Sequence, residues 1–229
     1  MRKPGEKTAA EMRAALSGIR CFLLDMDGTF YLGDRIIEGS MEFLQKVEQT
    51  GRSYLFLTNN SSRSVQHYVE KLGRLGLHVG EDKILTSGQA AAQYLKREYP
   101  GKRVFLLGNP SLREEMEKHG IALEDEHPDL VLVGFDTTLD YAKMTRVCDL
   151  VREGLPYIAT HPDFNCPTES GFIPDIGAIM AFIEASTGRK ADVIIGKPCG
   201  EIVRAAQERT GLAPGEMAML GDRLYTDVR

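Results

Sequence analysis

The strongest constraint on the fold is a regular alternation of short apolar runs with longer amphipathic stretches. Each apolar run has the length of one strand, and each amphipathic stretch has apolar residues at the spacing of a helix. Alternation of this kind is typical of parallel βαβ units, so it predicts an α/β fold. The expected strands are residues 20–24, 53–57, 103–107, 130–133, 157–160, 192–195 and 217–220, and the expected helices are 41–49, 65–75, 89–98, 111–119, 141–153, 178–186 and 201–210.

Local signals support some of these element boundaries. Thr8 followed by Glu11 has the spacing of a capping box, which predicts a short leading helix. Asn109 followed by Pro110 suits an N-cap with proline at the first helical position. The stretch 161–174 contains three prolines, and we expect a loop there, at a domain junction or a binding site.

Composition excludes several classes of partner. The chain has 229 residues, and 28 Lys and Arg stand against 33 Asp and Glu, for a formal net charge of -5. A surface that binds polyanions needs a basic excess, so we expect no nucleic-acid partner. The apolar runs are far shorter than a bilayer span, and the N-terminal segment lacks the apolar core of a secretory signal. We therefore expect no membrane partner and a cytoplasmic location, with the four scattered cysteines reduced.

An acidic motif follows the first predicted strand. Asp25 and Asp27 stand two residues apart, so on extended backbone their carboxylates point to the same side, and Gly28 allows a sharp turn after them. Two close carboxylates repel unless a cation lies between them, and oxygen ligands of this kind suit Mg²⁺. The motif predicts a magnesium site at the carboxyl end of the strand. A solvated Asp-x-Asp-Gly turn is the alternative.

Three further polar motifs each follow a predicted strand. They offer, in order, a hydroxyl with amide groups, a lysine fixed by a following proline, and a second acidic loop. Each alone has an ordinary explanation as turn chemistry. Because the carboxyl ends of parallel strands meet at one edge of a sheet, the motifs together predict a single site for an anion and a cation. They are Thr58-Asn59-Asn60, Gly196-Lys197-Pro198, and Gly221-Asp222-Arg223 with Thr226-Asp227.

These motifs, in this order, resemble those of the haloacid dehalogenase (HAD) superfamily. DMDGTFYLGDRIIEG, LTNNSSRS, IIGKP and GDRLYTD are similar to segments of its NagD / p-nitrophenylphosphatase-like branch. The resemblance implies a three-layer Rossmann-like HAD core with a parallel sheet plus an inserted α/β cap of the C2 type. The implied division is residues 1–100 for the first part of the core, 101–175 for the cap and 176–229 for the second part. Relatives continue past the position of Asp227 with a helix and at least one more strand, so the resemblance implies a truncated core sheet.

The resemblance also implies a reaction. It is the Mg²⁺-dependent hydrolysis of a small phosphomonoester, such as a sugar phosphate or a nucleotide, through an aspartyl-phosphate. Asp25 would be the nucleophile, and Asp27 would protonate the leaving group and later activate water. Thr58 and Lys197 would bind the phosphoryl group, and Lys197 would also offset the charge of Asp25.

Supporting residues follow from the same resemblance. Mg²⁺ would be held by Asp25, the main-chain carbonyl of Asp27, and Asp222, with Asp227 supporting the metal or its waters. In the loop THPDFNCP of the cap, a capped turn without substrate contact is the alternative to a binding role. Branch members often self-associate through the cap, so the resemblance allows a homodimer. The implied contacts to phosphate or substrate are Thr58, Asn59, Asn60, Lys197, His161 and Asp163.

Two other functions of the same fold stay open. A phosphotransferase would pass the phosphoryl group to an acceptor other than water, and a catalytically silent protein would only bind a metabolite. Dinucleotide-binding and P-loop enzymes are disfavoured, because no GxGxxG follows the first strand and Lys197 lacks the preceding glycine pattern.

Overall fold

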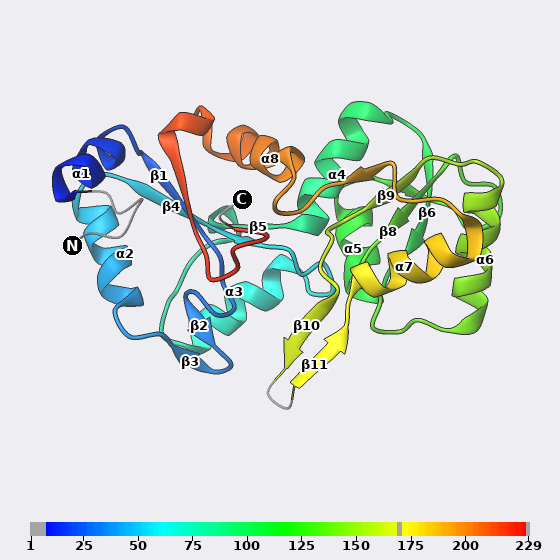
Figure 1. Cartoon of the computed structure of the whole chain (residues 1–229), viewed down its shortest axis with the longest axis horizontal. Helices are drawn as coiled ribbons and strands as arrows, with labels where there is room; N and C mark the ends of the chain where they lie inside the picture. Colours follow the sequence, from blue (N-terminus) through cyan, green and yellow to red (C-terminus); the bar gives the residue numbers. More distant parts are fainter. Residues whose placement is uncertain (1–7, 169–170, 228–229) are drawn as a thin grey trace.

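The first sheet carries most of the strand ends at which the motifs lie. In the computed structural model, which describes residues 8–168 and 171–227, its strand order is β13 (Met217–Leu220), β1 (Cys21–Leu24), β4 (Ser53–Thr58) and β5 (Ile84–Thr86). The neighbouring strands are parallel, and Phe22 of β1 lies between Ala218 and Tyr54. Their carboxyl ends therefore lie along one edge of the sheet (Figure 1).

Helices cover both faces of this sheet. The helices are α2 (Ser40–Gln49) and α3 (Val65–Arg74) on one face, and α4 (Ser87–Glu98) and α8 (Gly200–Thr210) on the other. Because successive strand residues point to opposite faces, Phe22 and Phe56 join the core under α2 and α3. Leu23 and Leu55 join the core under α4 and α8. The result is the three-layer arrangement that the family resemblance implied.

The second sheet is built from the middle of the chain. Its strand order is β12 (Val193–Ile194), β9 (Tyr157–Ala159), β8 (Leu130–Val133), β6 (Arg103–Leu107) and β7 (Ala122–Leu123), again parallel. Its helices are α6 (Tyr141–Arg152) and α7 (Ile176–Thr187) on one face and α5 (Pro110–Lys118) on the other. Helix α4 lies between the two sheets, and its Leu95 shares one core with Leu55 of the first sheet and Leu106 of the second.

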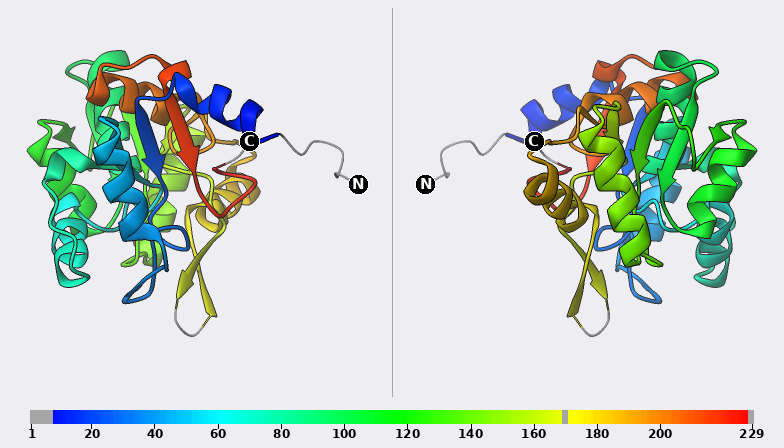
Figure 2. Two further views of the ribbon diagram at one scale, coloured as in Figure 1. Left: turned by 90° about the vertical axis from the view of Figure 1, so that its left-hand side faces the viewer. Right: turned by 90° about the vertical axis from the view of Figure 1, so that its right-hand side faces the viewer.

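Two short antiparallel hairpins lie on the same side of the molecule, and the one from the second sheet projects beyond the rest of the body (Figure 2). The remaining elements are a leading helix and two single 3₁₀ turns. These elements are the hairpins β2 (Tyr31–Leu32) with β3 (Arg35–Ile36) and β10 (Asn165–Thr168) with β11 (Gly171–Pro174), the helix α1 (Ala9–Ser17), and the turns η1 (Glu81–Lys83) and η2 (Pro214–Glu216).

The predicted α/β class, with a parallel sheet and a second α/β unit, is confirmed. Every predicted strand and helix lies within two residues of an observed one. Thr8 and Glu11 form the expected capping box, and Asn109 caps α5 with Pro110 in its first turn. In the described part of the chain, none of the helices has the length and apolar character needed to cross a bilayer.

The end of the second unit differs from the boundary at residue 175 that we expected. Helix α7 shares a core with the second sheet through Ile176 and Ile179, and β12 pairs with β9. The unit built on the second sheet therefore continues to about residue 195, not 175. The predicted loop 161–174 contains the hairpin β10–β11 inside this unit, and its side chains are too exposed to give an apolar alternation. Residues 1–7 and 228–229 of the predicted core lie outside the described residues.

Candidate active site

The four sequence motifs meet at the carboxyl edge of the first sheet. Asp25 follows β1, where its amide donates to the carbonyl of Leu220 at 2.9 Å, and Thr58 is the last residue of β4. Lys197 arrives from β12 of the second sheet through Gly196. A Cβ at Gly196 would lie 2.6 Å from Asn59 Oδ1, so only glycine lets the lysine loop pack this closely on the Thr58-Asn59-Asn60 loop.

A buried lysine lies between two carboxylates at this edge. Lys197 Nζ is 2.5 Å from Asp25 Oδ1 and 2.7 Å from Asp227 Oδ1, and each of the three residues is less than one-tenth exposed. Burial raises the pKa of the Asp25 carboxyl to about 6, and the Lys197 ammonium acts in the opposite direction. Because little water reaches these side chains, the electrostatic interactions between the lysine and the two carboxylates are strong.

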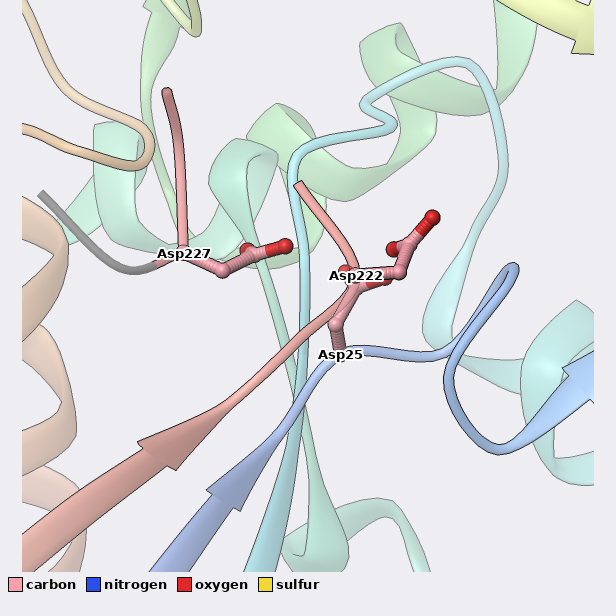
Figure 3. Close-up of side chains that lie close together, drawn as sticks. All are labelled: Asp25, Asp222 and Asp227. Carbon is pink, nitrogen blue, oxygen red and sulfur yellow. The ribbon is translucent and has the colours of Figure 1, made fainter. Parts of the chain in front are cut away.

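Three carboxylates in the described part of the chain form a candidate metal centre. Asp25, Asp222 and Asp227 each have a carboxylate oxygen within 4.8 Å of the others, with Asp25 at the end of β1 and the other two on the segment that follows β13 (Figure 3). At Gly28, where φ is +90°, a Cβ would lie 2.6 Å from Asp222 Oδ2, so glycine leaves the room that Asp222 occupies. Asp227 Oδ1 is buried and, within the described residues, has the ion pair with Lys197 but no hydrogen bond. An all-oxygen set of this charge fits Mg²⁺.

This placement differs in detail from the predicted ligand set. Asp227, expected in a supporting position, has an oxygen as close to the others as a ligand would need. The Asp27 side chain lies outside the group and instead contacts Tyr31 and Lys71. The role predicted for the main-chain carbonyl of Asp27 stays a prediction.

Asn59 holds the lysine loop and reaches the second sheet's unit. Its Oδ1 accepts from the Lys197 amide at 2.8 Å, and its Nδ2 donates to the Lys197 carbonyl at 3.1 Å and to Asp163 Oδ2 at 3.0 Å. Asn60 is also engaged, because its amide donates to Thr58 Oγ1 and its Oδ1 caps the next turn. The protein thus occupies both polar groups of the Asn59 side chain, which indicates a positioning role.

A cavity of about 300 Å³ opens above these groups. Asp25, Asp27, Thr58, Asn59, Asn60, Lys197 and Asp163 all line it. Its walls also include residues that the motifs did not indicate, among them Lys71 of α3, Ile173 of β11 and Asp175. Its position on the helix that follows the Thr58-Asn59-Asn60 loop is a sequence signal that would have pointed to Lys71. No signal indicated Ile173, because the hairpin was not expected.

The two predicted residues of the THPDFNCP loop differ in placement. Asp163 lines the cavity, and its Oδ1 is buried without a hydrogen bond from the described residues, 3.6 Å from Arg223 Nη1. His161 has no exposed surface, and its ring nitrogens lie 3.0 Å from Asp175 Oδ1 and 3.2 Å from Thr160 Oγ1. Both ring nitrogens are thus engaged inside the protein, which does not support a contact between His161 and substrate, and that contact stays a prediction.

Comparison with protein families supports the predicted resemblance. The family described as haloacid dehalogenase-like hydrolase matches residues 22–122, and a second, HAD-hydrolase-like family matches residues 194–229. The acid sugar phosphatase of Staphylococcus aureus is 35% identical over 210 residues, which are 91% of this chain and 81% of the relative.

Solved structures of similar proteins support the same family. The 4-nitrophenylphosphatase of Thermotoga maritima is 48% identical, with a TM-score of 0.90 over 93% of this chain and 82% of that chain. The p-nitrophenyl phosphatase of Archaeoglobus fulgidus is 34% identical, with a TM-score of 0.87 over 92% of this chain and 81% of that chain. The family expected from the motifs is confirmed: this chain belongs to the haloacid dehalogenase-like hydrolases, in the NagD / p-nitrophenylphosphatase-like branch.

Proposed function

We propose that this chain hydrolyses a small phosphomonoester and that Asp25 is the nucleophile. By its family and relatives the chain is a phosphoric monoester hydrolase. The observation that carries the assignment of the nucleophile is the buried contact of Asp25 with Lys197 at the floor of the cavity. A carboxylate that attacks a dianionic phosphate needs positive charge beside it, and Lys197 supplies that charge.

The reaction would proceed in two displacements. A carboxylate oxygen of Asp25 attacks phosphorus while the bond to the leaving oxygen breaks, and Asp27 gives its proton to that oxygen. Asp27 then takes a proton from a water molecule whose oxygen attacks phosphorus, which releases inorganic phosphate and regenerates Asp25. Thr58 and Lys197, both buried and both in the cavity wall, would hold the phosphoryl oxygens.

A divalent cation fits this scheme. Asp25, Asp222 and Asp227 would hold Mg²⁺, on the donor set described above. When bound, the ion adds positive charge that reduces the repulsion between the incoming phosphate and the acidic cluster. The chain's own contribution is to orient three carboxylates and to keep Lys197 within reach of the same oxygens.

Sugar phosphates are the favoured substrates. Asp163 lines the cavity, and its Oδ1 has no hydrogen bond from the described residues, so it is the acceptor that we propose for a substrate hydroxyl. The similarity to an acid sugar phosphatase supports the same class. We further propose that the unit of the second sheet acts as a cap over the site, since Asp163 and the hairpin β10–β11 come from it. Self-association through this unit stays a prediction.

Replacing the nucleophile tests the proposal. Asp25→Asn keeps the shape of the side chain but removes its nucleophilic charge, so turnover of p-nitrophenyl phosphate with Mg²⁺ should fall by at least about a thousandfold. Asp149→Asn, at an exposed residue of α6 paired only with Arg152 among the described residues, is the matched control. Equal turnover by Asp25→Asn and wild type would reject the assignment.

Product analysis separates the alternatives. A hydrolase releases inorganic phosphate and p-nitrophenol in equal amounts whether or not an acceptor alcohol is present. A phosphotransferase would release less phosphate than p-nitrophenol when the acceptor is added. A silent binding protein would release neither, while a metabolite that binds it would still raise its unfolding temperature.

A further inference from the structure

We propose that Tyr31 and Lys71 are positioning residues that fix the orientation of the Asp27 carboxylate, so that Oδ1 is the oxygen that exchanges a proton with the substrate. The inference rests on the proposed function, in which Asp27 serves the leaving group. It concerns two residues outside the strand-end motifs, one on the first hairpin and one on α3.

Tyr31 holds one oxygen of Asp27. Its hydroxyl donates to Asp27 Oδ2 at 3.1 Å, and the tyrosine has no exposed surface. Burial, and after it the Asp27 carboxylate, raise the pKa of Tyr31, so the hydroxyl keeps the proton that it donates in this hydrogen bond. The tight turn fixes the ring in place, because the Gly28 amide donates to the Tyr31 carbonyl at 2.8 Å and the Tyr31 amide donates to the Met26 carbonyl at 3.1 Å.

Lys71 approaches the other oxygen. Its Nζ lies 3.8 Å from Asp27 Oδ1 and 4.0 Å from the centre of the Tyr31 ring. The aromatic face and the carboxylate therefore hold the ammonium together, and the ammonium in turn lies over the ring that binds Oδ2. The three side chains make a closed set of contacts around one carboxylate.

The surroundings of the two oxygens differ. Asp27 and Lys71 line the cavity, whereas Tyr31 does not. Oδ2 is therefore turned toward the buried hydroxyl, and Oδ1 lies on the side of Lys71 and of the cavity. The Asp27 side chain is 44% exposed, so a leaving group can reach it.

This orientation defines the proton's path. When the bond from phosphorus to the leaving oxygen breaks and the bond to Asp25 forms, the proton moves from Asp27 Oδ1 to the leaving oxygen. In the second displacement Oδ1 receives the proton of the attacking water, and the Asp25 carboxylate is set free. Loss of Tyr31 or Lys71 leaves Asp27 present but free to rotate, and a misplaced acid transfers its proton less efficiently.

The test compares two esters of nearly the same shape, p-nitrophenyl phosphate and phenyl phosphate. The nitro group stabilises the departing phenolate, so the first ester needs little protonation and the second needs more. The measured quantity is kcat/KM, which reports only the steps up to release of the phenol. We expect Tyr31→Phe and Lys71→Met to lower kcat/KM for phenyl phosphate about tenfold more than for p-nitrophenyl phosphate. Lys71→Arg, which keeps the cation, should restore most of the loss.

Matched controls exist elsewhere in the chain. Tyr157→Phe removes the hydroxyl of another fully buried tyrosine, whose oxygen has no hydrogen bond within the described residues. Lys83→Met removes a cation that lies 5.0 Å from the ring centre of Tyr54, away from the cavity. Both controls should leave the ratio of the two kcat/KM values unchanged.

The outcomes separate this inference from the proposed function. If the wild type hydrolyses neither ester, the proposed function fails. If the wild type is active but Tyr31→Phe and Lys71→Met lower both kcat/KM values by the same factor, the positioning role is overturned and the proposed function stands. Should Tyr31→Phe fail to fold, the pair Lys71→Met and Lys71→Arg decides by the same ratio.

Discussion

The floor of the cavity and the hairpin beside it are held in different ways. On the floor, Asp25 and Lys197 are buried and joined by an ion pair of 2.5 Å, and Lys197 makes a second ion pair, of 2.7 Å, with the buried Asp227. In the hairpin β10–β11, by contrast, nearly every described side chain is exposed, and Phe172 is 74% exposed. The comparison teaches that ion pairs between opposite charges hold the buried side chains of the floor in place. The hairpin is instead held by the hydrogen bonds between its own two strands and by contact with α7.

The largest effect is expected when the balance of charge is broken. Lys197→Met leaves the carboxylates of Asp25 and Asp227 buried without their cation, which should lower the free energy of unfolding of the metal-free protein by about 3–5 kcal/mol at pH 7. Turnover should be lost as well. Guanidinium denaturation measures the stability, and Lys190→Met, at an exposed lysine, is the control. A variant as stable as wild type would show that the ion pairs do not hold the floor.

The pH dependence of the unfolding free energy tests the same balance of charge at Asp25. Its carboxyl has a folded pKa of about 6 against an ordinary value of 3.8, so the folded state binds the proton more tightly than the unfolded state. The associated stability is complete below about pH 4 and is lost as the pH rises through about 6, by about 3 kcal/mol in all. The unfolding free energy of metal-free wild type should therefore fall relative to that of Asp25→Asn between these values. Parallel pH curves for the two proteins would contradict the expectation.

The link between the floor and the second sheet's unit is tested at Asn59. In Asn59→Asp an oxygen replaces Nδ2 and faces Asp163 Oδ2 at 3.0 Å and the Lys197 carbonyl at 3.1 Å. Two hydrogen bonds become repulsive contacts, and we expect a loss of about 2–3 kcal/mol in unfolding free energy. Asn165→Asp, at an exposed hairpin residue, should change stability by less than about 0.5 kcal/mol. Similar losses in both variants would remove the distinction between the two regions.

The smallest effects are expected in the hairpin itself. Ile173 lines the cavity and lies outside the cluster of Asp25, Lys197 and the other acidic residues, so Ile173→Ser should raise KM for p-nitrophenyl phosphate by about threefold and leave kcat unchanged. Phe172→Ser, on the neighbouring exposed residue, should change neither constant. A fall in kcat for Ile173→Ser would mean that the hairpin shapes the reacting groups as well.

The position of the floor was predictable from sequence because each motif that supplies its residues follows a predicted strand. Strand ends are recognisable from apolar runs, and parallel strands bring their carboxyl ends together. Asp25, Thr58 and Asp222 could therefore be expected at one edge of the sheet from the sequence alone. The family resemblance, and not periodicity, supplied the roles expected of them.

The parts of the site contributed by the two hairpins and by His161 were less predictable, because their contacts leave no periodic pattern in the sequence. The hairpin β10–β11 has no buried face to produce an alternating pattern, and proline-rich sequence suggested a loop. The burial of His161 depends on its contact with Asp175, which lies 14 residues further along the chain, at the start of α7. Tyr31 and Lys71 meet at Asp27 only because the first hairpin folds back onto α3.

The path of the chain into Lys197 has one further consequence. The amides of Ile195 and Gly196 still donate to the carbonyls of Ala159 and Thr160, so the second sheet carries the lysine up to the residue before it. Asp25, its partner, is carried by the first sheet. The ion pair between Lys197 and Asp25 therefore joins the two sheets. A rotation of one half of the molecule against the other would separate the Lys197 ammonium from the Asp25 carboxylate, so under the proposed function the reaction needs both halves in contact.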